Sequence, residues 1–130
     1  SQPLRMVELL ETRIDSLSGK RIAVLGLAFK DNTDDVRESR SIPVIEALRR
    51  KGAVPVLFDP MAIDTMKAVF PDEEYAPSAA AALTHADGCL VMTEWPEFAK
   101  LSSEFDAMRE RVIIDGRHIL TIDDAEGICW

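Results

Sequence analysis

The sequence lacks the features that mark membrane, secreted or nucleic-acid-binding proteins. No apolar run approaches the roughly 20 residues needed to cross a bilayer, and no basic-then-apolar signal pattern opens the chain. Basic residues are in deficit, with 15 against 23 acidic ones, and the net charge of -8 repels nucleic acid and anionic lipid. No membrane or nucleic-acid partner is therefore expected, and the cytoplasm is the predicted compartment.

Cysteine is also scarce. The two cysteines, Cys89 and Cys129, form neither a metal-ligand spacing nor a disulfide framework, so no metal site is predicted. Cys89 lies in an apolar run, where a buried thiol that acts as a small hydrophobe is favoured over a nucleophile. No role is assigned to Cys129.

What is present is the composition of one globular domain. The chain has 130 residues, of which 47% are hydrophobic and 29% charged. Apolar runs of strand length alternate with helical patterns and turns. Strands are expected at 22–29, 54–58, near Tyr75, at 89–93, at 111–115 and from 128 onward; helices or helical turns at 41–51, 63–70, 78–86, 95–100, 102–109 and 123–126. This order predicts an α/β fold, a three-layer Rossmann-like sandwich with a mainly parallel sheet of about five to six strands.

An amphipathic lead-in helix is predicted over residues 1–17. Its apolar residues at 4, 7, 10, 14 and 17 have the spacing of one helix face. This apolar face precedes every predicted strand, so the sequence suggests an excised C-terminal piece of a longer protein. The alternative is a complete small protein whose helix folds back on its own sheet.

The rest of the chain is organised around residues 21–39. The apolar run of the first strand contains Gly26 and leads into a charged loop, and such strand ends converge on a ligand crevice in open α/β sheets. Dinucleotide binding needs a glycine-rich turn that lets the backbone approach a pyrophosphate. Here the bulky Leu27 and Phe29 occupy that turn, so NAD binding by this segment is not expected.

Two cations follow predicted strands and are candidates for binding an anion. Lys30 comes directly after the first strand, and Arg117 follows the strand 111–115. Each could equally be a solvated side chain on a loop. If the two strands lie near one another, both cations can meet the same anionic ligand.

The loop 31–39 and the end of the second strand carry carboxylates. Asp34 and Asp35 could form an acid–base pair or a metal site. With Thr33 ahead and Arg37 behind, we favour capping of the next helix, beginning near Ser41, and pairing with Arg37 to support the loop that carries Lys30.

Asp59 stands where a ribose-binding carboxylate would lie in a dinucleotide fold, but a cap before residues 63–70 is preferred because the glycine loop is missing. Trp95 either lines the crevice or packs on the sheet edge.

Several motifs together resemble the C-terminal domain of the UDP-glucose/GDP-mannose dehydrogenase family, and they run in order through most of the chain. They are Gly19-Lys-Arg-Ile-Ala-Val-Leu-Gly-Leu-Ala-Phe-Lys30, Thr33-Asp-Asp-Val-Arg-Glu-Ser39, Asp59-Pro-Met-Ala62, Thr93-Glu-Trp95 and Ile114-Asp-Gly-Arg117. The first two together are highly specific.

The resemblance implies a nucleotide-sugar (UDP- or GDP-sugar) binding domain of an NAD-dependent 6-dehydrogenase, which oxidises a nucleotide sugar to its uronic acid. Phe29, Lys30 and Arg117 match the family's substrate-binding positions. No residue of this chain matches the catalytic cysteine, and NAD is expected on a missing N-terminal domain, so the fragment alone is expected to be inactive. The family often has proline after the serine matching Ser39, whereas in this sequence Arg40 follows and the proline comes later, at position 43.

The resemblance also implies partners and boundaries. Residues 1–18 would be the tail of the central connecting helix and 19–130 the UDP-sugar-binding domain. The full-length protein is expected to be a homodimer that also contains N-terminal and central domains. Two alternatives stand beside this reading: a free-standing α/β binding or receiver-like signalling module that uses Asp34 and Asp35, and a fragment that serves mainly as an assembly surface.

Overall fold

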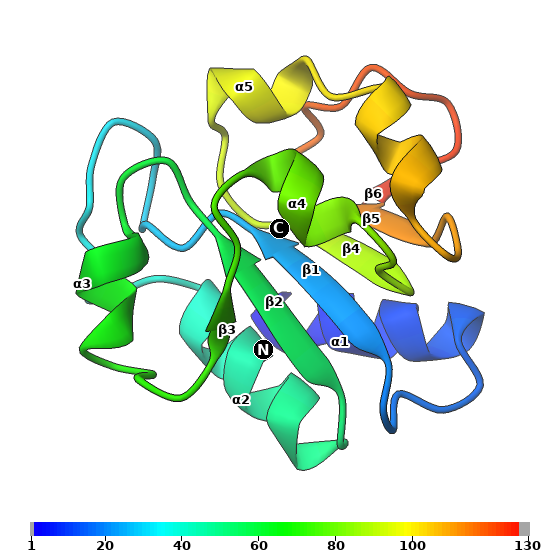
Figure 1. Ribbon diagram of the computed structural model, residues 1–130, viewed down its shortest axis with the longest axis horizontal. Helices are drawn as coiled ribbons and strands as arrows, with labels where there is room; N and C mark the ends of the chain where they lie inside the picture. Colours follow the sequence, from blue (N-terminus) through cyan, green and yellow to red (C-terminus); the bar gives the residue numbers. More distant parts are fainter. Residues whose placement is uncertain (1, 128–130) are drawn as a thin grey trace.

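The computed structural model describes residues 2–127, which form one six-stranded parallel sheet with helices on both faces (Figure 1). The strand order is β3-β2-β1-β4-β5-β6. The strands are β1 (Arg21–Leu25), β2 (Val54–Phe58), β3 (Glu74–Tyr75), β4 (Gly88–Val91), β5 (Ile113–Asp115) and β6 (Glu126–Gly127).

This is the doubly wound Rossmann order, in which the chain moves outward from β1 first on one side and then on the other. The predicted α/β sandwich is confirmed. A receiver-like module has the order 2-1-3-4-5 instead, so that alternative is wrong.

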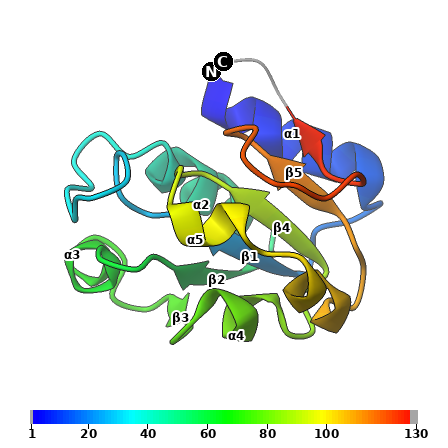
Figure 2. The same cartoon turned by 90° about the horizontal axis from the view of Figure 1, so that it is seen from above.

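Two hydrophobic clusters lie on opposite faces of the sheet. The helices α1 (Gln2–Arg13) and α2 (Ser41–Arg50) cover one face. The short helices α4 (Ala79–Leu83) and α5 (Pro96–Ala99), with the 3-10 turn η1 (Ser103–Ala107), cover the other. Figure 2, seen from above, shows α1 and α2 on one side of the strands and α4 on the other.

The strand β1 lies inside the sheet and contributes to both clusters. Ile22 and Val24 face α1 and α2, whereas Ala23 and Leu25 face α4 and α5. The sequence predicted a strand as far as Phe29, but β1 ends at Leu25. Gly26 has φ of +104° and turns the backbone out of the sheet, so the rest of the apolar run packs as a turn.

The helix α2 begins at Ser41, where the sequence predicted it, but it has no side-chain cap. Arg40 is the N-cap residue. The Ser41 hydroxyl instead donates a hydrogen bond to the Gly26 carbonyl at 2.7 Å, which ties the start of α2 to the end of β1.

Other elements are shorter than the sequence suggested. The helix α3 (Ile63–Lys67) ends three residues before Phe70, and the turn at 123–124 is followed by β6. The expected edge strand at Tyr75 is present as β3. The strand predicted from residue 128 lies outside the described residues.

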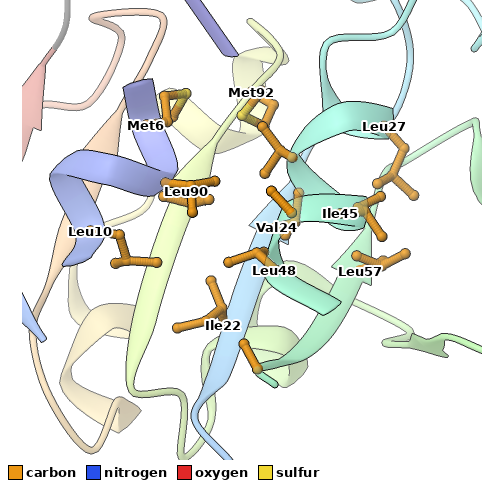
Figure 3. Close-up of a cluster of buried hydrophobic side chains, with 14 of the residues drawn as sticks. Met6, Leu10, Ile22, Val24, Leu27, Ile45, Leu48, Leu57, Leu90 and Met92 are labelled. Atoms are coloured by element: carbon orange, nitrogen blue, oxygen red, sulfur yellow. The ribbon is translucent and has the colours of Figure 1, made fainter. Parts of the chain in front are cut away.

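The helix α1 packs against the sheet of this domain. Met6 and Leu10 are fully buried and lie beside Leu90 of β4 (Figure 3). Met6 was not part of the predicted apolar face, but it lies four residues before Leu10 on the same side of the helix and is buried with it, whereas Leu4 is only partly buried. The helix ends at Arg13, four residues before the predicted end. None of the helices within residues 2–127 is long and apolar enough to cross a bilayer.

Candidate functional site

The switch point of the sheet lies between β1 and β4, where the chain reverses its direction of winding. In open α/β sheets a ligand crevice forms outside the strand carboxyl ends at this point. The loops that border it here are residues 26–40, which follow β1, and residues 92–95, which follow β4.

At the switch point the two strand ends touch. A Cβ added to Gly26 would lie 2.5 Å from the Thr93 hydroxyl oxygen and 2.6 Å from its backbone nitrogen. The Thr93 hydroxyl donates a hydrogen bond to the Ala28 carbonyl at 3.1 Å. Glycine is required at position 26 because no side chain fits between the two loops.

Asp59, at the end of β2, is the most heavily bonded side chain of this edge and is 2% exposed. Its Oδ1 accepts the backbone N–H groups of Met61 and Ala62 at 2.8 and 2.9 Å. The carboxylate therefore does hold the turn before α3. The expected helix cap is nevertheless wrong, because Ala62 is the N-cap residue of α3 and has no side-chain cap.

The second oxygen of Asp59 reaches across the crevice. Oδ2 accepts the N–H groups of Leu27 at 2.8 Å and Ala28 at 3.1 Å, and the indole N–H of Trp95 at 3.0 Å. Trp95 is 6% exposed, so its ring is part of the core on this side rather than of the rim.

These bonds decide what the first turn can hold. In a dinucleotide-binding domain the backbone N–H groups of this turn face the pyrophosphate, and a helix begins directly after them. Here an internal carboxylate takes the N–H groups of Leu27 and Ala28, and α2 starts only at Ser41. These two N–H groups are therefore already bonded inside the domain and do not face outward as a pyrophosphate-binding turn requires.

Beyond this fixed turn, Phe29 and Lys30 are exposed, Phe29 to 49%. The N–H of Phe29 donates to the Asp35 carbonyl at 2.7 Å and closes the loop on itself. Phe29, Asp35, Arg37 and Glu38 line a pocket of about 390 Å³. The Phe29 side chain is thus available to a ligand although its backbone is fixed.

The loop is closed by Thr33, Asp35 and Arg37. The Thr33 hydroxyl accepts the Asp35 N–H at 3.1 Å, and Asp35 accepts two guanidinium N–H bonds from Arg37, at 3.0 and 2.8 Å. These bonds and that from the Arg37 backbone lower the pKa of Asp35 to about 2. The expected pairing with Arg37 is present, but neither aspartate caps α2, and Asp34 is exposed.

Arg117 follows β5 and is held by two carboxylates. Its guanidinium donates to Glu94 of the loop after β4, and its backbone N–H donates to Asp115 at 3.1 Å. Asp115 is 5% exposed and also accepts the Leu120 N–H at 2.8 Å, so it fixes the turn around Arg117.

The two predicted cations are not on neighbouring strands. The strand β4 lies between β1 and β5, so two strand spacings, together about 10 Å, separate the strands that carry Lys30 and Arg117. The loop 92–95 stands between them. Both belong to the same edge of the sheet, but a ligand that touches both must span this loop.

Sequence reasoning missed part of this arrangement. Asp59 was interpreted as a local cap, and Glu94 was not singled out as the partner of Arg117. Both residues directly follow predicted strands, and the ends of parallel strands meet at one edge of the sheet. Their positions could therefore have indicated that Asp59 and Glu94 contact the neighbouring loops. Cys89 is buried as expected, and burial raises the pKa of its thiol. Cys129 lies outside the described residues.

Fold and site together define a Rossmann-type α/β domain whose switch point presents a loop with an exposed aromatic and charged residues in place of a glycine-rich phosphate turn. Residues 23–122 match the family model of the UDP-glucose/GDP-mannose dehydrogenase family, UDP binding domain. The chain belongs to this family and corresponds to its C-terminal, UDP-binding domain.

Individual relatives agree with this assignment. The chain is 59% identical over 120 residues to UDP-glucose 6-dehydrogenase AglM of Haloferax volcanii, covering 92% of this chain and 28% of that protein. It is 35% identical over 128 residues to UDP-glucose 6-dehydrogenase TuaD of Bacillus subtilis, covering 96% and 28%. The chain thus spans less than a third of the length of these relatives.

Solved structures show the same fold. The UDP-glucose dehydrogenase of Pyrobaculum islandicum superposes with a TM-score of 0.77 at 35% identity, over 85% of this chain and 29% of that one. The UDP-D-ManNAc dehydrogenase of Pyrococcus horikoshii gives 0.78 at 28% identity, over 97% and 30%.

Proposed function

We propose that this chain is the nucleotide-sugar-binding domain of an NAD-dependent 6-dehydrogenase that oxidises a nucleotide sugar to its uronic acid. Membership of the family and the relatives named as UDP-glucose 6-dehydrogenases support the proposal. The single observation that carries it is that Phe29 and Lys30 follow β1 and Arg117 follows β5, so that the loops with these three candidate residues leave the carboxyl edge of one parallel sheet.

In this proposal each residue has a separate task. The ring of Phe29, half exposed beside its pocket, packs against the ligand. Lys30 and Arg117 supply positive charge to phosphate or sugar oxygens, which the acidic chain as a whole repels. The strands that precede these cations, β1 and β5, are separated by β4, and this separation suits a ligand that is longer than one phosphate.

The remaining parts of the enzyme follow from the same proposal. NAD and the catalytic cysteine belong to a domain outside this chain, residues 1–18 continue a central connecting helix, and residues 19–130 form the substrate domain. The whole enzyme is a homodimer of the cytoplasm.

The test is kinetic and uses the full-length enzyme. Lys30→Ala or Arg117→Ala should raise the KM for the nucleotide sugar at least tenfold, because a hydrogen bond to a charged group contributes about 1.5–3 kcal/mol. The KM for NAD should change little.

Lys20→Ala is the matched control, since Lys20 precedes β1 at the opposite edge of the sheet. It should leave both KM values unchanged. An equal loss of NAD affinity in the Lys30 and Arg117 variants, or no loss of either, would overturn the proposal.

A further inference from the structure

The Asp59 carboxylate is surrounded only by hydrogen-bond donors. Each of its two oxygens accepts at least two N–H groups, and the side chain is 2% exposed. An asparagine would turn its amide N–H₂ toward existing N–H donors whichever way it was oriented. The site therefore requires a carboxylate and not merely a polar side chain of this shape.

The donors come from three different strand ends. Leu27 and Ala28 follow β1, Met61 and Ala62 follow β2 together with Asp59 itself, and Trp95 follows β4. One buried group thereby fixes the spacing of three loops across the switch point. Charge-assisted bonds of this kind are the strong ones in a dry environment.

These bonds stop one residue short of the candidate ligand site. Ala28 is 3% exposed, whereas the next residue, Phe29, is 49% exposed. The backbone on the other side is held by the bond from the Phe29 N–H to Asp35. The two exposed side chains therefore project from a backbone that is anchored immediately before them by Asp59.

We propose that Asp59, held by the indole N–H of Trp95, is a positioning residue that fixes the 27–30 turn so that Phe29 and Lys30 meet the nucleotide sugar. This inference rests on the proposed function. Asp59 stands where a dinucleotide fold places its ribose carboxylate, but here the carboxylate is turned inward and serves the architecture of the turn.

Two variants of the full-length enzyme test the role of Asp59. Asp59→Asn should raise the KM for the nucleotide sugar roughly tenfold or more, while kcat and the KM for NAD stay within about twofold. Trp95→Phe keeps an aromatic ring and removes only the N–H bond to Asp59, so it should raise the same KM about threefold to tenfold. If Asp59→Asn does not fold, the KM of Trp95→Phe for the nucleotide sugar alone tests the positioning role of Asp59.

Asp87→Asn is the matched control. Asp87 is also a buried carboxylate, 4% exposed, and accepts the Arg21 N–H at 3.0 Å, but it lies at the opposite edge of the sheet. If general destabilisation caused the effect, this variant would raise the KM for the nucleotide sugar as much as Asp59→Asn does, and the inference would be overturned.

A double-mutant cycle separates the inference from the proposed function. If Asp59 and Trp95 act through the turn, Trp95→Phe combined with Lys30→Ala should lose clearly less affinity than the product of the two single losses. A loss equal to that product, or an unchanged KM in both Trp95→Phe and Asp59→Asn while Lys30→Ala is impaired, would overturn the positioning role alone. An unimpaired Lys30→Ala would overturn the proposed function together with it.

Discussion

At the scale of the residue, the pKa of Asp35 is a measure of the bonds that close the loop containing Phe29 and Lys30. Its bonds with Arg37 hold its pKa at about 2, below the ordinary value of 3.8. Because the pKa of this carboxyl group is lower in the folded state, the ion pair stabilises the loop at pH values above the ordinary pKa of 3.8. This contribution is lost as the pH falls toward 2.

We expect Arg37→Gln to return the pKa of Asp35 toward 3.8, because the guanidinium bonds are the largest cause of the shift. NMR titration of the Asp35 carboxyl carbon measures this. Since Arg37 is 87% exposed, added salt should also reduce the shift in the unsubstituted protein. A pKa that is the same with and without Arg37 would contradict the pairing.

Gly26 is the second residue on which the site depends. Gly26→Ala should lower the free energy of unfolding by roughly 2–5 kcal/mol, because a positive φ is strained for alanine and the new methyl group would overlap Thr93.

Chemical denaturation of the chain measures this change. Gly19→Ala is the control, since Gly19 also has a positive φ, +75°, but no neighbour within 4 Å of an added Cβ. Gly19→Ala should cost only about 1–2 kcal/mol, the cost of the left-handed backbone conformation for an L-residue. Equal losses in the two variants would show that the contact with Thr93 contributes nothing.

At the scale of the element, α1 is a structural part of the domain and not only a lead-in. Its Met6 side chain lies against Gly116, where an added Cβ would come within 2.8 Å of the Met6 sulfur. The helix therefore packs directly behind the turn that carries Arg117. Whether residues 1–18 belong to a longer connecting helix stays a prediction.

We expect Leu10→Ala to destabilise the domain by about 2–5 kcal/mol, because Leu10 is fully buried between α1 and the sheet. Leu9→Ala, on the same helix but at a partly buried position, should cost clearly less. Urea denaturation followed by circular dichroism compares them. If Leu10→Ala cost no more than Leu9→Ala, α1 would not be part of the cooperative core.

At the scale of the whole molecule, the proposed function assigns binding of the nucleotide sugar to this chain, and NAD and the catalytic cysteine to residues outside it. In the first turn of the chain's Rossmann-type sheet, the Asp59 carboxylate accepts the N–H groups that face the pyrophosphate in a dinucleotide-binding domain. The one cysteine within residues 2–127 is buried beneath α4 and has a raised thiol pKa. Under the proposed function, both features place the redox step on residues outside this chain.

The 130-residue chain alone should therefore not reduce NAD in the presence of UDP-glucose, whereas the full-length enzyme should. Absorbance of NADH follows the reaction. Adding the rest of the enzyme as a separate chain is an informative control, because recovery of activity would show that the domain retains its binding role. NADH formation by the chain alone would contradict the division of function.

Much of the fold could be predicted from local patterns. The apolar run 54–58 is strand β2, and the last three residues of the predicted strand 111–115 form β5. The three-and-four spacing of residues 4, 7 and 10 marks α1, because burial of one helix face depends on a periodicity that is visible in the sequence. The predicted strand 22–29 was too long because hydrophobicity does not distinguish a strand from a buried turn. The positive φ of Gly26 made that distinction.

The sequence by itself thus determined the order of strands and helices, the family, and the positions of Phe29, Lys30 and Arg117 at the ends of strands. Only the tertiary structure decided how these ends are held. Asp59 bonds to Leu27 and Trp95 across 32 and 36 residues, and Arg117 to Glu94 across 23. Such bonds arise because the parallel sheet brings distant strand ends to one edge, and no local pattern carries that distance.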